Sequence, residues 1–269
     1  MRAESARTAQ GAATETRATG GRRRRRMAGF AAACKAEVLK GRHAAPRKIA
    51  LIAPLPFCIL GVYSGEFPTY GWNYWYALML PIAIALMTAS IANIDLRQKL
   101  RTVLGLPLPP ARAWWAKVAY ALALVLVANL VVLAASVVAG LLGFNVPSPA
   151  AGLVTAMLLV VASAWMVPAG LALTVRFGTL AGIAVPAVLQ VGLGVALWTS
   201  SSWFLFPPAT ALCAVAPLVG VAPSGVPLEA GDPLGVFGWE CAAGLALAVA
   251  LFAVLAVLGA RWFAKREAL

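Results

Sequence analysis

The sequence predicts an all-α, polytopic membrane protein with six transmembrane helices, and three observations support this prediction. First, 62% of the 269 residues are hydrophobic and only 12% are charged, whereas a soluble domain carries about 25% charged residues. Second, uncharged stretches long enough to cross roughly 30 Å of bilayer hydrocarbon recur along the chain. Third, all 22 lysines and arginines fall within four parts of the sequence, residues 1–48, 95–117, 176 and 261–266.

The confinement of the basic residues predicts the topology. Cytoplasmic segments of membrane proteins are enriched in lysine and arginine. Six crossings place every basic stretch on the cytoplasmic side, together with both ends of the chain. The sequence therefore predicts a multi-pass protein of the cell membrane whose N- and C-termini are both cytoplasmic.

The chain divides into a short extension and one membrane domain, residues 28–269. Residues 1–27 consist mainly of Ala, Gly, Ser, Thr and Arg and contain a run of five arginines, which is typical of a disordered basic segment. This extension is either a membrane-surface tether or an upstream stretch before a working start at Met27. Both interpretations are favoured over an arm that binds nucleic acid.

The membrane domain is expected to begin with a helix lying in the membrane interface, over residues 28–43. Phe30, Cys34 and Val38 recur at intervals of four residues and form an apolar stripe with basic residues at its edges. This helix leads into the first span.

The spans are predicted from the uncharged runs, approximately 49–62, 73–94, 116–142, 151–175, 178–199 and 237–260. Pro54 and Pro56 break the first span. Residues 63–71 are expected to form an outer loop, followed by an aromatic belt at the membrane surface that comprises Trp72, Tyr74, Trp75 and Tyr76. Gly178 and Gly182 provide a packing face of small residues in the fifth span.

The outer segment between spans five and six, residues 200–236, has an unusual composition. It is too apolar for a solvated loop and too rich in proline for a straight span. We expect short helices that lie in the outer interface or dip into it, as interfacial or re-entrant elements.

The loop between spans two and three is predicted to contain a short charged helix. Its apolar stripe and its basic residues lie on different faces, and Asp95 is expected at its N-terminus, where it suits the helix dipole and can pair with Lys99. Gly105 and Pro107 end the helix. The residues concerned are Asp95, Leu96, Arg97, Lys99, Leu100, Arg101, Val103, Leu104, Gly105 and Pro107. Such a helix either contacts a soluble partner or rests on lipid.

Several kinds of chemistry are excluded by the sequence. No lysine follows a glycine, so the chain has no recognisable phosphate-binding loop for ATP. A single histidine excludes a zinc site of the HExxH type. The spans contain almost no ionisable side chains, which a proton-coupled carrier would need. We therefore expect no enzyme activity, no metal and no cofactor in this chain, and an energy source on another subunit.

The order of several short motifs resembles the ABC-2-type permeases of lantibiotic-immunity transporters (the MutE/EpiE type). The resemblance covers about residues 30 to 265. The motif positions are Glu37 and Lys40 in the N-terminal part, Asn73, Trp75, Tyr76 and Pro81 in the second span, Leu104 to Pro107 in the loop, Lys117 in the third span, and Pro217 to Gly231 in the outer segment.

The resemblance implies a function and a set of partners. It implies a six-span permease subunit that pairs with a second permease subunit, identical or different, and with a cytoplasmic ABC ATPase. Such an assembly moves an antimicrobial peptide out of the membrane and gives self-immunity. The loop helix would be the coupling helix that seats in the ATPase.

Acidic residues of the predicted outer face are candidates for contact with a cationic peptide. No basic residue is expected among them, so they could concentrate cations electrostatically. The alternative is that these acids have no role in binding. The residues are Glu66, Glu229, Asp232 and Glu240.

Two alternatives to peptide export remain from the sequence. One is an ABC-2 permease for another cargo, such as a lipid, a drug or a polysaccharide. The other is a protein without transport activity, either a membrane scaffold or an intramembrane enzyme, and the lack of catalytic clusters counts against the enzyme. The mid-chain loop helix counts against a plain scaffold.

Overall fold

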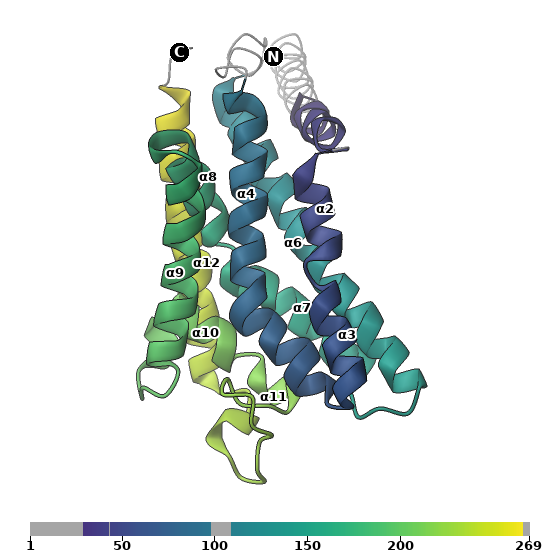
Figure 1. The fold of residues 1–269 in the computed structure, drawn as a ribbon. Helices are drawn as coiled ribbons and strands as arrows, with labels where there is room; N and C mark the ends of the chain where they lie inside the picture. Colours follow the sequence, from purple (N-terminus) through teal and green to yellow (C-terminus); the bar gives the residue numbers. More distant parts are fainter. Residues whose placement is uncertain (1–28, 43, 98–108, 266–269) are drawn as a thin grey trace, which may run out of the picture.

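The computed structural model describes residues 29–42, 44–97 and 109–265, and this part of the chain folds into a helical bundle (Figure 1). Five helices are long and apolar enough to cross a membrane, or six if the bent pair α7 and α8 counts as one span. The prediction of an all-α, multi-pass membrane protein is confirmed at this level. The predicted basic extension, 1–27, lies outside the described residues.

The elements follow one another in this order. They are an N-terminal helix over residues 29–40, α2 (Ala45–Ile52), α3 (Leu55–Ser64), η1 (Phe67–Asn73), η2 (Trp75–Met79), α4 (Leu80–Leu96), α6 (Pro110–Leu141), α7 (Pro149–Ser163), α8 (Met166–Phe177), α9 (Thr179–Leu197), η3 (Trp203–Leu205), α10 (Pro207–Cys213), α11 (Ala216–Val219), η4 (Pro233–Gly235) and α12 (Trp239–Ala264).

The first span is broken at the predicted place. It consists of α2 and α3, which meet at Ala53 and Pro54, and Pro56 lies in the first turn of α3. The span begins at Ala45, four residues before its predicted start. The N-terminal helix lies across the direction of the long helices and joins the start of α2 (Figure 1).

The second span starts earlier than predicted, and the expected outer loop 63–71 is wrong. Helical structure resumes at Phe67 and continues to Leu96, with π-helical winding in η1 and η2. The expected aromatic belt is also wrong, because Trp72 and Trp75 are fully buried within the protein. These large rings gain favourable contacts by packing against neighbouring helices. The stretch that the sequence assigns to the membrane surface is therefore part of the span.

Asp95 lies at the end of a transmembrane helix and not at the start of a loop helix, which corrects the prediction. It occupies the last turn of α4. Its side chain is buried and forms ion pairs with Lys40 and Lys117. The third span begins at Pro110, six residues before its predicted start. Leu96 is the last residue of α4 and Arg97 is its C-cap. The other residues of the predicted coupling helix lie outside the described part, namely Lys99, Leu100, Arg101, Val103, Leu104, Gly105 and Pro107.

Span four is bent, and span five shows half of the predicted glycine motif. The axes of α7 and α8 differ by 41° at a short break. Gly178 forms the turn between α8 and α9 with a φ of +94°, a conformation that favours glycine. Gly182 packs closely against Thr174 of α8. Of the two glycines in the predicted motif, only Gly182 therefore packs against a neighbouring helix.

The outer segment folds into short helices, as predicted. The most buried of them is α10, which packs against α7, α9 and α12. Gln190 of α9 stabilises this arrangement, because its side chain accepts a hydrogen bond from Trp165 at 3.1 Å and donates one to the carbonyl of Pro208 at 3.3 Å. The segment thus enters the bundle and does not only cover it.

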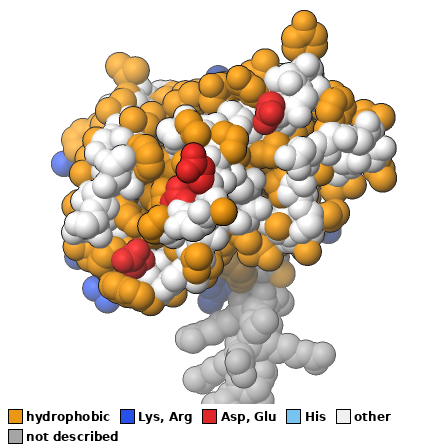
Figure 2. Space-filling view, turned by 90° about the horizontal axis from the view of Figure 1, so that it is seen from below, with side chains coloured by type: hydrophobic (Ala, Val, Ile, Leu, Met, Phe, Trp, Pro, Cys, Tyr) orange, Lys and Arg blue, Asp and Glu red, His pale blue; other side chains and the backbone are white. Residues whose placement is uncertain are grey.

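The charged residues separate to the two ends of the bundle. The end that carries the N-terminal helix, the last turns of α4, α8 and α12 and the start of α6 holds the described lysines and arginines, and we call it the basic end. The opposite, acidic end carries Glu66, Glu229, Asp232 and Glu240. Viewed from that side, acidic side chains lie on the face and basic ones are seen only at its margin (Figure 2).

We predict that the acidic end faces outward. Single cysteines placed at Ser64, Ser148 and Ser224 in a cysteine-free background should react with an impermeant thiol reagent added to intact cells, because all three positions are exposed at this end. A cysteine at Thr102, in the basic loop, should react only after the membrane is opened. External labelling of Thr102 would contradict the proposed orientation.

Candidate functional site

Four charged side chains from three elements form a buried ion-pair cluster at the basic end. Lys117 of α6 donates to both carboxylate oxygens of Glu37, at 3.1 and 3.0 Å, and to Oδ2 of Asp95. Lys40 donates to Oε1 of Glu37 at 3.0 Å and to Oδ1 of Asp95 at 3.1 Å. Glu37, Asp95 and Lys117 are at most 5% exposed.

The cluster is balanced, with two carboxylates and two ammonium groups. Each carboxylate contacts both lysines. Burying charges is costly unless they are closely paired, and removing one partner then costs several kcal/mol. Burial alone would lower the pKa of Lys40, but the carboxylates of Glu37 and Asp95 outweigh burial and raise it. Lys40 therefore remains charged at neutral pH.

The helical repeat of the N-terminal helix explains its place in the cluster. Glu37 and Lys40 are three residues apart and share one face. The same helix buries Ala33 against the protein, whereas Phe30 and Val38 are exposed. The predicted apolar stripe therefore faces away from the protein, as expected for contact with lipid. Gly41 allows close approach, because a side chain there would overlap the ring of Tyr120 in α6.

The cluster joins both ends of the segment that carries the predicted coupling helix. Asp95 lies in the last turn of α4, and Lys117 lies in the second turn of α6. Glu37 and Lys40 bridge these two positions from the N-terminal helix. The segment between α4 and α6 is therefore anchored at both ends by one buried network.

The sequence indicated most members of this cluster but not their association. Glu37, Lys40 and Lys117 were selected by the resemblance, and Asp95 was expected to pair with Lys99. A signal was present in the sequence, since Asp95 and Lys117 each adjoin a long run without charged residues. Such charges usually require partners of opposite sign.

A second group of motif residues lies in the half of span two that is nearer the acidic end. Asn73 donates to the hydroxyl of Tyr76 at 2.9 Å and to the carbonyl of Ala222 at 2.8 Å. Trp75 donates to Asn129 of α6 at 2.9 Å. Pro81 lies within this continuous helix, directly after the π-helical stretch η2, and its missing N–H leaves one backbone hydrogen bond of the helix unmade. The contact of Asn73 with Ala222 attaches the outer segment to the second span, and that of Trp75 with Asn129 attaches the second span to α6.

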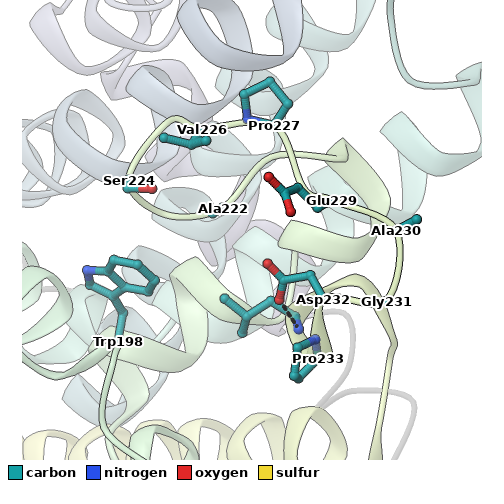
Figure 3. A pocket seen from close by; sticks show the side chains of 11 residues that line it. Trp198, Ala222, Ser224, Val226, Pro227, Glu229, Ala230, Gly231, Asp232 and Pro233 are labelled. Atoms are coloured by element: carbon teal, nitrogen blue, oxygen red, sulfur yellow. Dashed lines mark hydrogen bonds between the residues drawn. The ribbon is translucent and has the colours of Figure 1, made fainter.

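The outer segment forms a pocket of about 640 Å³ at the acidic end. The side chains of Glu229 and Asp232 point toward the same space, with Trp198 and Ser224 across from them (Figure 3). Asp232 accepts a hydrogen bond from the backbone N–H of Leu234 at 2.8 Å, which fixes its orientation. The pocket thus combines two carboxylates with an aromatic wall, a combination suited to a cationic, partly apolar group.

The four acidic residues predicted for the outer face are not all brought together. Glu229 and Asp232 share the pocket. Glu240 lines a smaller neighbouring cavity of about 130 Å³. Glu66 lies in the turn after α3 and forms a backbone bridge with Asn145. Only Glu229 and Asp232 therefore form a joint candidate site.

Other kinds of site are not found in the described part of the chain. No group of three or more His, Cys, Asp or Glu side chains there is placed to hold a metal ion. All four cysteines are free, including Cys213 and Cys241, which lie in one small apolar cluster. No family model matches the chain, and no curated protein or solved structure matches it. The function must therefore be inferred from the cluster, the pocket and the helices.

Proposed function

We propose that this chain is the transmembrane permease subunit of an ABC transporter, driven by a separate cytoplasmic ATPase that contacts the segment between α4 and α6. The observation that carries the proposal is the buried ion cluster. It anchors both ends of that segment, through Asp95 and Lys117, and connects them to the N-terminal helix through Glu37. In this proposal the basic end is cytoplasmic.

The cluster suits the transmission of force. A push on the segment would reach α4 and α6 together, because pulling the paired charges apart inside the protein costs several kcal/mol. From Asp95, the second span runs without interruption to the π-helical stretch that holds the outer segment through Asn73. The described contacts therefore connect the proposed ATPase contact with the outer pocket.

The outer pocket supports a cationic peptide as the cargo. Glu229 and Asp232 have no basic residue among the described side chains of the acidic end, and Trp198 adds an apolar surface. A lantibiotic or similar antimicrobial peptide combines positive charge with apolar side chains. Export of such a peptide for self-immunity, with a second permease subunit completing the assembly, is the activity that we propose.

The coupling role predicts which substitutions release the ATPase. Leu100→Ala combined with Leu104→Ala should strongly reduce the ATPase recovered with the tagged chain, because each lost apolar anchor can cost about 2 kcal/mol. Arg97→Ala should have a much smaller effect, since a charge at the rim mainly changes the association rate. The measurement is ATPase recovery from membranes at equal levels of inserted chain.

Two results would contradict the coupling role. Undiminished recovery with the double-leucine variant would indicate that the segment only rests on lipid. Failure of the wild-type chain to recover any ATPase would favour a membrane scaffold.

The proposed cargo predicts an effect of salt on protection. Glu229→Gln with Asp232→Asn should weaken protection against a cationic antimicrobial peptide at low salt more than at high salt, because salt screens exposed charges. The matched control is Glu66→Gln with Glu240→Gln, which removes the same charge outside the pocket. Survival curves at two ionic strengths provide the measurement. Equal protection by both double variants would exclude the pocket as the contact site.

A further inference from the structure

We propose that a pocket at the basic end binds the phosphate group of an anionic lipid headgroup. The pocket has a volume of about 340 Å³ and lies between the start of α2 and the end of α4. Residues 44–46 form one wall, and Ser90, Asn93, Ile94 and Arg97 form the other. It does not overlap the ion cluster, and the inference does not depend on the proposed transport function.

The charge of the pocket is positive and uncompensated within the described residues. Arg97 brings a guanidinium group to the lining and forms no ion pair with a described residue. The described acids of the basic end, Glu37 and Asp95, are both held by Lys40 and Lys117. The cluster thus removes the carboxylates that could neutralise Arg97. Arginine suits phosphate because its planar group can donate two parallel hydrogen bonds.

The pocket also offers neutral donors. The start of α2 has no side-chain cap, because its N-cap residue is Ala44. Within residues 44–46, Pro46 has no N–H and the N–H of Ala44 donates to the carbonyl of Gly41 at 3.2 Å, so the N–H of Ala45, which has no partner within the helix, is the backbone donor of this wall. The hydroxyl of Ser90 forms no hydrogen bond with a described residue. The C-terminal carbonyl groups of α4 carry partial negative charge and repel an anion. The positive charge of Arg97 is therefore what makes the pocket attractive to an anion.

The position of the pocket favours a lipid over a soluble phosphate compound. Exposed apolar side chains lie on the two elements that adjoin residue 44 in the chain: Val38 and Leu39 on the N-terminal helix, and Leu51 and Ile52 on α2. These side chains provide an apolar surface for acyl chains on the same elements that flank the pocket. The described lining contains no carboxylate that could receive the ammonium group of a zwitterionic lipid. The pocket should therefore select lipids with net negative charge.

The test measures the thermal unfolding midpoint of the purified full chain in detergent during titration with short-chain lipids. Dioctanoyl-phosphatidylglycerol should raise the midpoint with saturation, and dioctanoyl-phosphatidylcholine should not. Arg97→Gln should weaken the apparent affinity for phosphatidylglycerol about tenfold, the effect of losing a charged hydrogen bond. Arg176→Gln, which removes an exposed charge from the same end, should change it less than about twofold.

Further arms of the experiment can overturn the proposal. Ser90→Asp places a carboxylate in the lining and should abolish the response to phosphatidylglycerol, while the midpoint without lipid shows whether the variant is folded. Equal weakening by Arg97→Gln and Arg176→Gln would indicate attraction to the whole basic end and would overturn the site. Stabilisation by inorganic phosphate alone, with no further effect of the lipid, would overturn the assignment to a lipid.

Discussion

Replacing Lys117 with methionine should lower the free energy of unfolding by about 3–5 kcal/mol, the cost of leaving a buried charge without its partner. Lys117 contacts both Glu37 and Asp95, and all three side chains are almost completely buried. Without it, two carboxylates share the single ammonium group of Lys40. SDS-induced unfolding in mixed micelles measures the change.

A second substitution separates the loss of charge balance from the loss of packing. Lys117→Met with Asp95→Asn removes one charge of each sign and leaves Glu37 paired with Lys40. This double variant should recover at least half of the stability lost by Lys117→Met, because the two positions are directly coupled. Arg112→Met, also near the start of α6 but without an ion pair among the described residues, is the control. No recovery in the double variant would indicate that packing, and not charge, explains the role of Lys117.

Gly182→Leu should destabilise the chain by about 3 kcal/mol, the upper part of the usual cost of overpacking. A side chain at Gly182 would overlap the hydroxyl of Thr174 and approach its backbone nitrogen to 2.9 Å. Thr174 cannot turn away easily, because its hydroxyl donates to the carbonyl of Gly170 at 2.7 Å. The helices α8 and α9 would have to separate.

Gly192 provides a matched control on the same helix. A side chain at Gly192 meets no atom within 4 Å, so Gly192→Leu should not destabilise the chain and should gain up to about 1 kcal/mol, because leucine has a higher helix propensity than glycine. The comparison uses the same unfolding measurement. Equal destabilisation by the two substitutions would show that the contact with Thr174 does not determine the result.

The sequence predicted the features that depend on local pattern. Hydropathy predicted six spans. The described part of the chain has five such helices, or six if the bent pair α7 and α8 counts as one crossing. The prolines Pro54 and Pro56 predicted the break in span one, and the proline-rich composition of residues 200–236 predicted short helices. Each of these depends on residues close together in the chain.

The features that the sequence failed to predict depend on contacts between distant residues. The partners of Lys117 lie 22 and 80 positions away, so an amphipathic pattern around Asp95 could not reveal its ion pairs. The burial of Trp72 and Trp75 depends on neighbouring helices in the same way. An aromatic run has the same hydropathy whether it faces lipid or protein. Periodicity also does not distinguish π-helical from α-helical winding.

The neutrality of the ion cluster has a consequence for how the chain enters the membrane. Before the helices pack, Lys40 and Lys117 are unpaired charges near the ends of spans, and such charges help to retain a segment on the cytoplasmic side. After packing, their charge is balanced by Glu37 and Asp95, and Lys117 is buried while Lys40 stays partly exposed. If the basic end is cytoplasmic, as we propose, the same two lysines would act as orientation signals during biogenesis and as internal counterions afterwards. Orientation of the mature protein at the membrane surface is then left to the basic residues outside the cluster.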